Sequence, residues 1–193
     1  LGVFLLSIVV IVILGGMLDY LIKHPTQPLY FAADDVSRLI QDVPLTQPNM
    51  PLEEVVAWTI DAVESTYSYD YVNYRQQIQD SQKYFASYGS YKYLKGLGES
   101  ANLVALTKRK MVSIAKVVEK PKLVGEGILK TGSYGYKFEV PVLVTYLTPP
   151  FGDKDSFQNP LMVYVVVQRQ RILDSYKGLG IMQMNARIVT NSS

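Results

Sequence analysis

The chain opens with a run of apolar residues that polar groups hardly interrupt. Leu1 to Leu18 carries no charge, and Asp19 is the first ionisable side chain. About 20 apolar residues, each rising 1.5 Å along a helix, cross a hydrocarbon layer of about 30 Å. Asp19 and the interfacial aromatic Tyr20 suit the outer end of such a helix. The pattern predicts a membrane-spanning helix over residues 1–22.

A cleaved signal peptide is the alternative for this segment. The apolar run is longer than the usual core of about 7–15 residues, and no Ala-x-Ala-like cleavage site follows near Ile22. A retained span is therefore favoured. Because the sequence begins at leucine rather than methionine, we expect a further segment ahead of it. The charge of that flank is unknown, so charge does not give the orientation of the span.

Residues 23–50 have the pattern of an extended linker. Prolines interrupt any long helix in this stretch, and they are Pro25, Pro28, Pro44 and Pro48. Tyr30 and Phe31 are the aromatic residues here, and we treat both as candidate contacts for a partner. At about 3.3 Å per residue the linker could extend over about 90 Å.

A helical period begins at residue 51. Pro51 suits the start of a helix, and Glu53 complements the positive end of the helix dipole. Apolar residues then recur every three or four positions, and they are Leu52, Val56, Ile60, Val63 and Tyr67. Trp58 lies off this stripe, so we expect something else to cover it and count it as a candidate partner contact. A second helix is predicted after Asp70, and a third over residues 89–110 with a break at Gly96–Gly98.

The period changes to two after residue 110, which predicts strands. The predicted strands cover residues 111–118, 122–130, 136–147, 161–171 and 180–189. Helices followed by antiparallel strands predict an α+β domain over residues 51–193, with the helices packed on one face of a curled sheet. The predicted loop from Pro149 to Pro160 carries Phe151 and Phe157, which are further candidate partner contacts.

Composition and motifs point away from catalysis. The net charge is +2, and there is no cysteine for a disulfide, a thiol nucleophile or a sulfur-ligated metal. His24 is the single histidine, and neither a phosphate-binding loop nor a Gly-x-Ser-x-Gly nucleophile motif occurs. The paired carboxylates Glu53 and Glu54 fit a helix start, and Asp153 and Asp155 fit a solvated loop. We predict no enzyme activity, no cofactor and no metal site.

Tyrosine is unusually frequent, with fifteen residues in the chain and eight of them between Tyr67 and Tyr93. One interpretation is a stacking platform for single-stranded nucleic acid, which needs aromatic and basic residues interleaved. Few basic residues accompany the tyrosines, and many of them follow helical spacing. Packing or a protein interface is therefore favoured, and direct contact with nucleic acid is not expected.

Several segments together resemble the DotI/IcmL family of bacterial type IVB secretion proteins. The resemblance begins with Tyr30-Phe31 and Trp58, and it covers the span and nearly all of the predicted domain. The remaining matching segments are Pro44 to Met50, Tyr67 to Tyr74, Tyr84-Phe85, Glu139 to Tyr146 and Gly178 to Gln183.

The resemblance implies a non-enzymatic scaffold of the Dot/Icm inner-membrane complex, or of a related conjugation system with TraM-like proteins. It implies a single-pass protein of the bacterial inner membrane, anchored by Leu1 to Ile22, whose C-terminal domain lies in the periplasm. The implied fold is nuclear-transport-factor-two-like, similar to the eighth VirB protein. The implied partners are further copies in a ring-like homo-oligomer, a DotJ-like paralogue and other secretion subunits.

Two other functions stay open on the sequence alone. The first is a membrane-anchored periplasmic small-molecule-binding module or enzyme, because this α+β class can form a concave pocket and fold does not decide function. The second is contact with translocating DNA through the tyrosine and lysine clusters. A deep cavity with converging polar groups would favour the first, and salt-dependent binding of single strands would favour the second.

Overall fold

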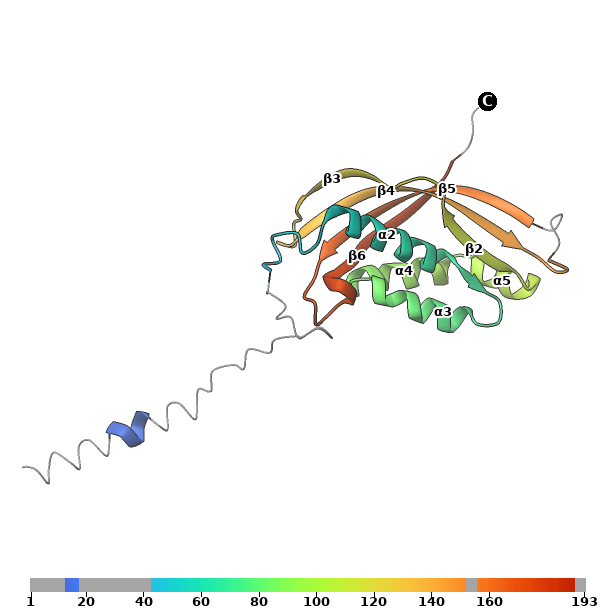
Figure 1. Cartoon of the computed structure of the whole chain (residues 1–193). Coiled ribbons are helices and arrows are strands. Elements are labelled where there is room, and N and C mark those ends of the chain that lie inside the picture. Colours follow the sequence, from blue (N-terminus) through green and yellow to red (C-terminus); the bar gives the residue numbers. More distant parts are fainter. Residues whose placement is uncertain (1–12, 18–42, 152–155, 190–193) are drawn as a thin grey trace, which may run out of the picture. The chain divides into compact units, whose positions relative to one another are not determined.

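The computed structural model describes residues 13–17, 43–151 and 156–189 (Figure 1). The chain divides into two units, residues 1–41 and 42–193. In the first unit only Ile13–Met17 is described, and it is helical. No helix within the described residues is long and apolar enough to cross a membrane. Most of the predicted span over residues 1–22, and the candidate contacts Tyr30 and Phe31, lie outside the described residues.

The second unit begins with a helix whose buried face differs from the predicted one. Helix α2 covers Leu52–Tyr67, as expected, but Leu52 is exposed. The inward face includes Thr59 and Thr66, whose hydroxyls donate to the carbonyls of residues 55 and 62 at 2.7 Å and 2.6 Å. These local bonds satisfy the polar groups, so threonine can be buried where the apolar pattern predicted a solvent-facing position.

Three more helices follow, and they are α3 (Tyr74–Ser81), α4 (Ser87–Glu99) and α5 (Asn102–Arg109). The predicted helix over residues 89–110 is interrupted, as expected, but at Ser100–Ala101 rather than at Gly96–Gly98, because both glycines lie within α4 and α4 ends after Glu99. Ser100 closes it there by donating from its hydroxyl to the Leu97 carbonyl at 2.9 Å.

Gly89 fixes how closely α4 approaches the sheet. A Cβ atom at this position would overlap the carbonyl oxygen of Ile181 in the last strand. No other residue type leaves that space empty, so glycine here permits a close contact between helix and strand.

The strands form one antiparallel sheet in the order β1-β2-β4-β5-β6, with β3 also paired to β4. Figure 1 shows β3, β4 and β5 arching over helices that gather on one side of the sheet. The strand bounds are β1 (Tyr69–Asp70), β2 (Val112–Val117), β3 (Lys122–Ile128), β4 (Tyr134–Leu147), β5 (Ser156–Arg169) and β6 (Leu179–Ile188).

The five strands predicted from period-two alternation are confirmed, while the two-residue β1 was not predicted. The largest difference is β5, which begins at Ser156 rather than at 161. The predicted loop from Pro149 to Pro160 is therefore wrong in its second half. Pairing of β4 with β5 continues out to Leu147 and Ser156, because a long hairpin satisfies more backbone groups than a long loop does.

The core lies between α2 and the concave face of the sheet. Alternate residues of β4 point inward, as the sequence predicted, and these are Tyr136, Phe138, Val140, Val142 and Val144. Val55 and Val63 from α2 and Ile181 from β6 complete the same buried cluster. Burial of these side chains is the main force holding the helices on the sheet.

Residues 43–50 pack against the end of the domain through Arg169. This arginine is 2% exposed, and its Nη2 donates to the carbonyl of Val43 at 3.0 Å and its Nε to that of Gln47 at 3.2 Å. The backbone N–H of Tyr134 donates to the Leu45 carbonyl at 2.7 Å. The domain thus includes a segment that the sequence pattern placed in the linker.

Candidate functional site

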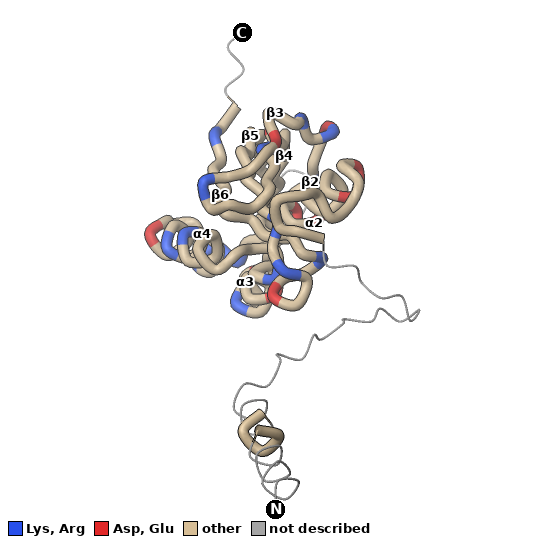
Figure 2. Tube along the Cα trace, turned by 90° about the vertical axis from the view of Figure 1, so that its left-hand side faces the viewer, with Lys and Arg blue, Asp and Glu red and all other residues tan. Residues whose placement is uncertain are grey.

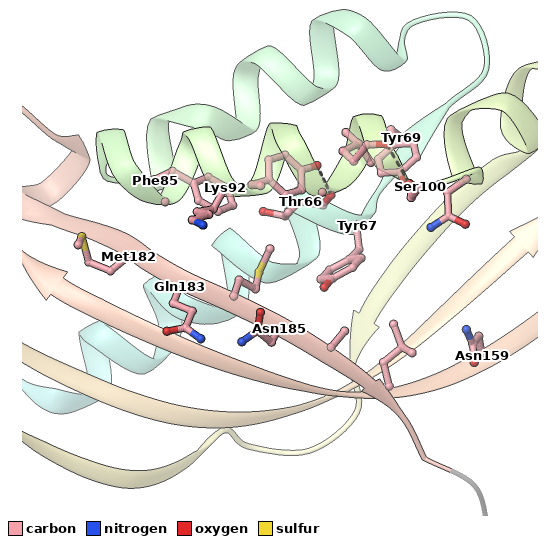
Figure 3. Close-up of a pocket in the computed structure, with 18 of the residues that line it drawn as sticks. Thr66, Tyr67, Tyr69, Phe85, Lys92, Ser100, Asn159, Met182, Gln183 and Asn185 are labelled. Atoms are coloured by element: carbon pink, nitrogen blue, oxygen red, sulfur yellow. Dashed lines mark hydrogen bonds between the residues drawn. The ribbon is translucent and has the colours of Figure 1, made fainter.

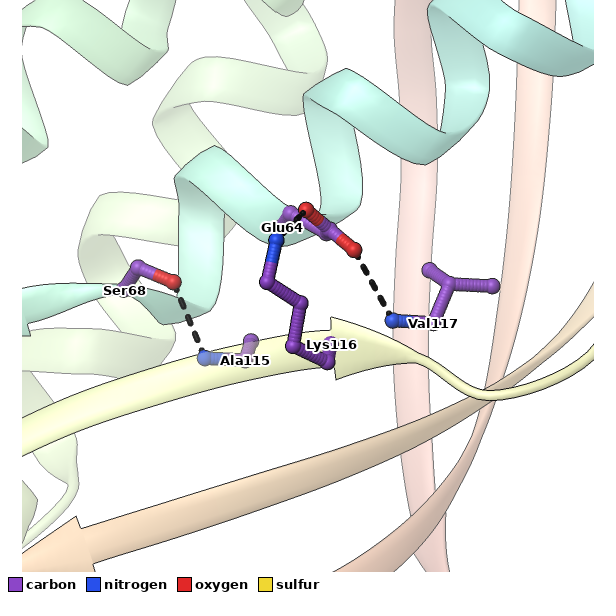
Figure 4. Close-up of polar contacts among 5 residues, drawn as sticks. All are labelled: Glu64, Ser68, Ala115, Lys116 and Val117. Carbon is purple, nitrogen blue, oxygen red and sulfur yellow. Dashed lines mark hydrogen bonds and ion pairs between the residues drawn. The ribbon is translucent and has the colours of Figure 1, made fainter.

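The β2 edge and the β6 edge of the sheet are treated differently by the fold, and side chains close the first of these two edges. On β2, the backbone N–H of Ala115 donates to the hydroxyl of Ser68 at 2.9 Å, and that of Val117 donates to Glu64 Oε1 at 3.0 Å. Lys116 adds an ion pair with Glu64 Oε2 at 2.8 Å (Figure 4). Side chains from the end of α2 therefore occupy the donors that another strand could use.

The opposite edge, on β6, is closed only at its start. The backbone N–H of Ala86 donates to the Ile181 carbonyl at 3.0 Å. Further along, Val189 donates to the Pro160 carbonyl of β5 at 3.0 Å. Along an antiparallel strand, the backbone N–H and C=O groups of successive residues point alternately toward and away from the neighbouring strand. Because Val189 points toward β5, the N–H and C=O groups of Met184, Ala186 and Ile188 point away from it.

These outward groups form an open edge, which we define as Met184, Ala186 and Ile188. Among the described residues, no backbone group pairs with them. Unpaired strand edges accept strands from other chains unless charge, proline or a covering element blocks them. Arg187 is the one charged residue of β6, so the open edge has little such protection.

A groove runs beside the open edge, between α4 and the concave face of the sheet. Its volume is about 690 Å³, and the side chains that line it include Tyr67 and Tyr93 from the helical side and Met184 from β6. Figure 3 shows Tyr67 reaching into the space between the two layers, with Gln183 and Asn185 coming from the strand. The groove and the open edge thus form one continuous surface.

Five tyrosines line the groove, and they are Tyr67, Tyr69, Tyr88, Tyr93 and Tyr146. Burial raises the pKa of Tyr67 and of Tyr69 to about 12, and neighbouring phenols add to the effect. Burial also raises the pKa of Tyr93, whose hydroxyl donates to the Thr66 carbonyl at 3.1 Å. These phenols are therefore neutral at physiological pH and serve as hydrogen-bonding and packing groups.

The lining carries no group suited to be a general base at neutral pH. Among the residues that line the groove, Lys92 is the only charged side chain, and neither a carboxylate nor an imidazole occurs. The other polar lining groups are phenols, hydroxyls and amides. Within the described residues, no three carboxylate, imidazole or thiol groups come together as a metal site.

The groove opens onto an exposed apolar surface at its far end. Tyr146 and Phe157 face each other across β4 and β5, with ring centroids 6.3 Å apart and nearly parallel planes. Phe157 is 64% exposed, and Ile188 at the end of β6 is 67% exposed. Large apolar side chains that stay in water beside an open edge are typical of a docking surface.

The structure separates the residues that the sequence singled out. Trp58 is 2% exposed and packs edge-on against Tyr84, with ring centroids 5.5 Å apart, so the domain's own core covers it. It is not available on the surface of this domain. Phe157 lies in β5 beside the groove, whereas Phe151 is exposed after β4. Met184 and Ile188 were missed, because only the strand order shows that their edge is open.

The surface charge is mixed. Figure 2 shows basic and acidic segments interspersed over the domain.

Comparisons with known proteins agree on one group. The family model for DotI/IcmL, described as a type IVB secretion-system inner-membrane complex component, matches residues 4–188. The periplasmic domain of DotI has 28% sequence identity to this chain and a TM-score of 0.67, covering 72% of this chain and 97% of its own. No curated protein sequence matches the chain significantly.

Two other solved structures share the fold. A periplasmic fragment of TraM is 24% identical with a TM-score of 0.63, covering 72% of this chain and 98% of its own. CagV, a VirB8 homologue from Helicobacter pylori, is 11% identical with a TM-score of 0.56, covering 70% of this chain and 98% of its own. The predicted α+β fold, with helices on a curled antiparallel sheet similar to VirB8 proteins, is confirmed.

Proposed function

The chain belongs to the DotI/IcmL family of type IVB secretion-system inner-membrane complex components, and we propose that it acts there as a scaffold that associates through the open edge of β6. The family is a structural component of a secretion complex. We propose further that the protein is not an enzyme, in keeping with a groove that offers phenols, amides and one ammonium group.

The proposed arrangement has three parts. A single helix over residues 1–22 spans the inner membrane, residues 23–42 form the linker, and the remainder forms a periplasmic domain. The apolar run at the start of the chain supports the span. The structurally similar domains of DotI and TraM are periplasmic, which supports the compartment. A nuclear-transport-factor-two-like description fits the curled sheet with its helices.

The contrast between the two sheet edges carries the proposal. Ser68 and Glu64 occupy the donors of β2, whereas Met184, Ala186 and Ile188 present theirs to solvent beside a groove. An extended segment that pairs with such an edge gains main-chain hydrogen bonds, and its alternate side chains can enter the groove. The open edge is therefore suited to strand addition.

We propose a second copy of this chain as the occupant. If two β6 edges pair antiparallel with Ala186 opposite Ala186, Arg187 of each copy lies opposite Asn185 of the other. This register keeps the two arginines from facing each other. Like charges directly opposite one another would oppose pairing. Such a contact gives a dimer, and the ring-like assembly expected for the family would need one further contact. A DotJ-like paralogue would use the same edge if its strand is similar.

The test is the mass and composition of the complex that is solubilised in detergent from its native membrane. The proposal predicts an assembly with several copies of this chain together with other secretion subunits. A monomer that carries no other subunit contradicts it. If that monomer carries a small molecule in the groove, the alternative of a periplasmic binding module replaces it.

A further inference from the structure

The loop between β5 and β6, residues 170–178, holds apolar side chains out in water. Leu173 is 73% exposed, and Ile172 and Tyr176 are also exposed. The loop is ordered by its own hydrogen bonds: the N–H of Asp174 donates to the Arg171 carbonyl at 3.0 Å, and that of Gln170 donates to the Gly178 carbonyl at 2.9 Å. The apolar side chains are thus presented by a defined loop.

Basic groups surround these apolar side chains. Arg171 and Lys177 belong to the loop, and the ammonium of Lys83 lies 5.3 Å from the centre of the Tyr176 ring. Tyr176 also packs edge-on against Tyr84, which fixes its position. Asp174 is the one acidic residue of the loop, so three cations accompany one carboxylate. An apolar tip with a cationic rim complements an anionic lipid surface.

The loop lies at the end of the domain where the preceding chain joins it. Asn49 Nδ2 donates to the Lys177 carbonyl at 3.0 Å. Arg169, the last residue before the loop, donates to the carbonyl of Val43. Twenty residues separate the predicted span from Val43, and at about 3.3 Å each they extend at most about 66 Å. A chain anchored in a membrane would therefore hold this end of the domain within reach of the bilayer.

We propose that the loop of residues 170–178 docks on the anionic phospholipid surface of the membrane in which the chain is anchored. Ile172 and Leu173 enter the level of the headgroups, where Tyr176 serves as an interfacial aromatic. Arg171, Lys177 and Lys83 lie against lipid phosphates. This inference rests on the proposed inner-membrane anchoring. Docking would fix the height and tilt of the domain, so that β6 edges of neighbouring copies meet at one level.

Vesicle binding by the isolated domain, residues 43–193, tests the inference. This part is a compact unit with its own core, and the similar DotI domain was solved as a periplasmic domain by itself. The domain should co-sediment with vesicles of phosphatidylglycerol and phosphatidylethanolamine and much less with phosphatidylcholine alone. High salt should weaken the binding.

Substitutions locate the contact. L173S should lower the vesicle partition coefficient about tenfold, because one large apolar side chain no longer enters the lipid. R171E combined with K177E should lower it by at least roughly tenfold. V124S is the matched control, since Val124 on β3 is also an exposed aliphatic residue but lies outside the loop. L173W should show a blue shift of its tryptophan fluorescence when anionic vesicles are added. The native domain, whose emission comes from the buried Trp58, is the reference for this shift.

The inference is overturned if the domain ignores anionic vesicles, or if V124S weakens binding as much as L173S does. Failure of vesicle binding while the native membrane complex still contains secretion subunits rejects the docking alone. Loss of that complex rejects the proposed function instead.

Discussion

Glu64 Oε1 accepts a hydrogen bond from the backbone N–H of Val117 at 3.0 Å, joining the fourth turn of α2 to the edge of β2. The same carboxylate holds Lys116 through its other oxygen at 2.8 Å. One side chain therefore closes a strand edge on which a partner could otherwise pair. From Met184 to Ile188 the β6 edge has no such cover among the described residues, so of these two edges β6 is the one on which a partner strand can pair.

Replacing Glu64 should open the β2 edge. We expect E64A to destabilise the domain by about 1–2 kcal/mol, because a part-buried N–H loses its acceptor. Urea unfolding measures the change. E64Q keeps an acceptor oxygen and should lose less, and E119A at an exposed site near the end of β2 should change stability little. Equal stability of E64A and E119A would show that Glu64 does not hold the edge.

Arg169 should determine whether residues 43–50 stay on the domain. R169M removes donors to the carbonyls of Val43, Gln47 and Gly178, and we expect a loss of about 3 kcal/mol because the arginine is buried and its three bonds are buried or part-buried. Hydrogen exchange should show faster exchange at the Tyr134 N–H, which bonds Leu45. Lysine cannot reproduce the planar fork, so R169K should not restore stability. Unchanged exchange at Tyr134 in R169M would contradict this anchoring role.

Two glycines of α4 should respond in opposite directions to alanine. G89A places a Cβ against the Ile181 carbonyl and should destabilise the domain by about 2–3 kcal/mol. Gly96 has no atom within 4 Å of an added Cβ. G96A should therefore stabilise the domain by up to about 1 kcal/mol, through helix propensity. Thermal or urea unfolding measures both, and a neutral G89A would show that α4 does not pack this closely on β6.

The buried phenols should make stability fall at alkaline pH. Burial raises the pKa of Tyr67 and Tyr69 to about 12 in the folded domain, against about 10 in an unfolded chain. Above pH 10 the unfolded state therefore releases protons that the folded state keeps. The stability is fully present below about pH 10 and decreases as pH rises toward 12.

Urea unfolding at pH 8 and pH 11 measures this loss, and the 295 nm absorbance of tyrosinate reports the titration itself. The double variant Y67F/Y69F should lose less stability between the two pH values than the native domain. The same loss in both proteins would mean that other groups cause the alkaline effect.

The sequence predicts the local elements well, because the periods of two and 3.6 are properties of neighbouring residues. The alternation from Tyr136 to Tyr146 predicts β4, and the pattern after Pro51 predicts α2. Features that depend on distant residues were not predictable. Trp58 lies off the apolar stripe, yet Tyr84 from another element covers it. Gly96 and Gly98 suggest a break, but α4 continues through both glycines and ends at Glu99.

The candidate site depends even more on tertiary structure. Nothing in the β6 segment distinguishes an edge strand from a central one, since only the strand order makes its outer groups available. The cluster of tyrosines between Tyr67 and Tyr93 did indicate a packing or interface role, and four of them line the groove beside α4. Phe157 was selected as a loop residue, whereas it is exposed in a strand at the groove's open end.

The most direct test of the account is the association of the domain when Ala186 is replaced by proline. A186P removes an N–H that points away from β5, so the internal ladder keeps its bonds, and edge strands tolerate proline at such positions. A186V keeps the donor and is the matched control. Sedimentation and cross-linking of the full chain in detergent should show association for the native protein and A186V, and loss of association for A186P with its fold intact. Undiminished association of a folded A186P would contradict assembly through the β6 edge.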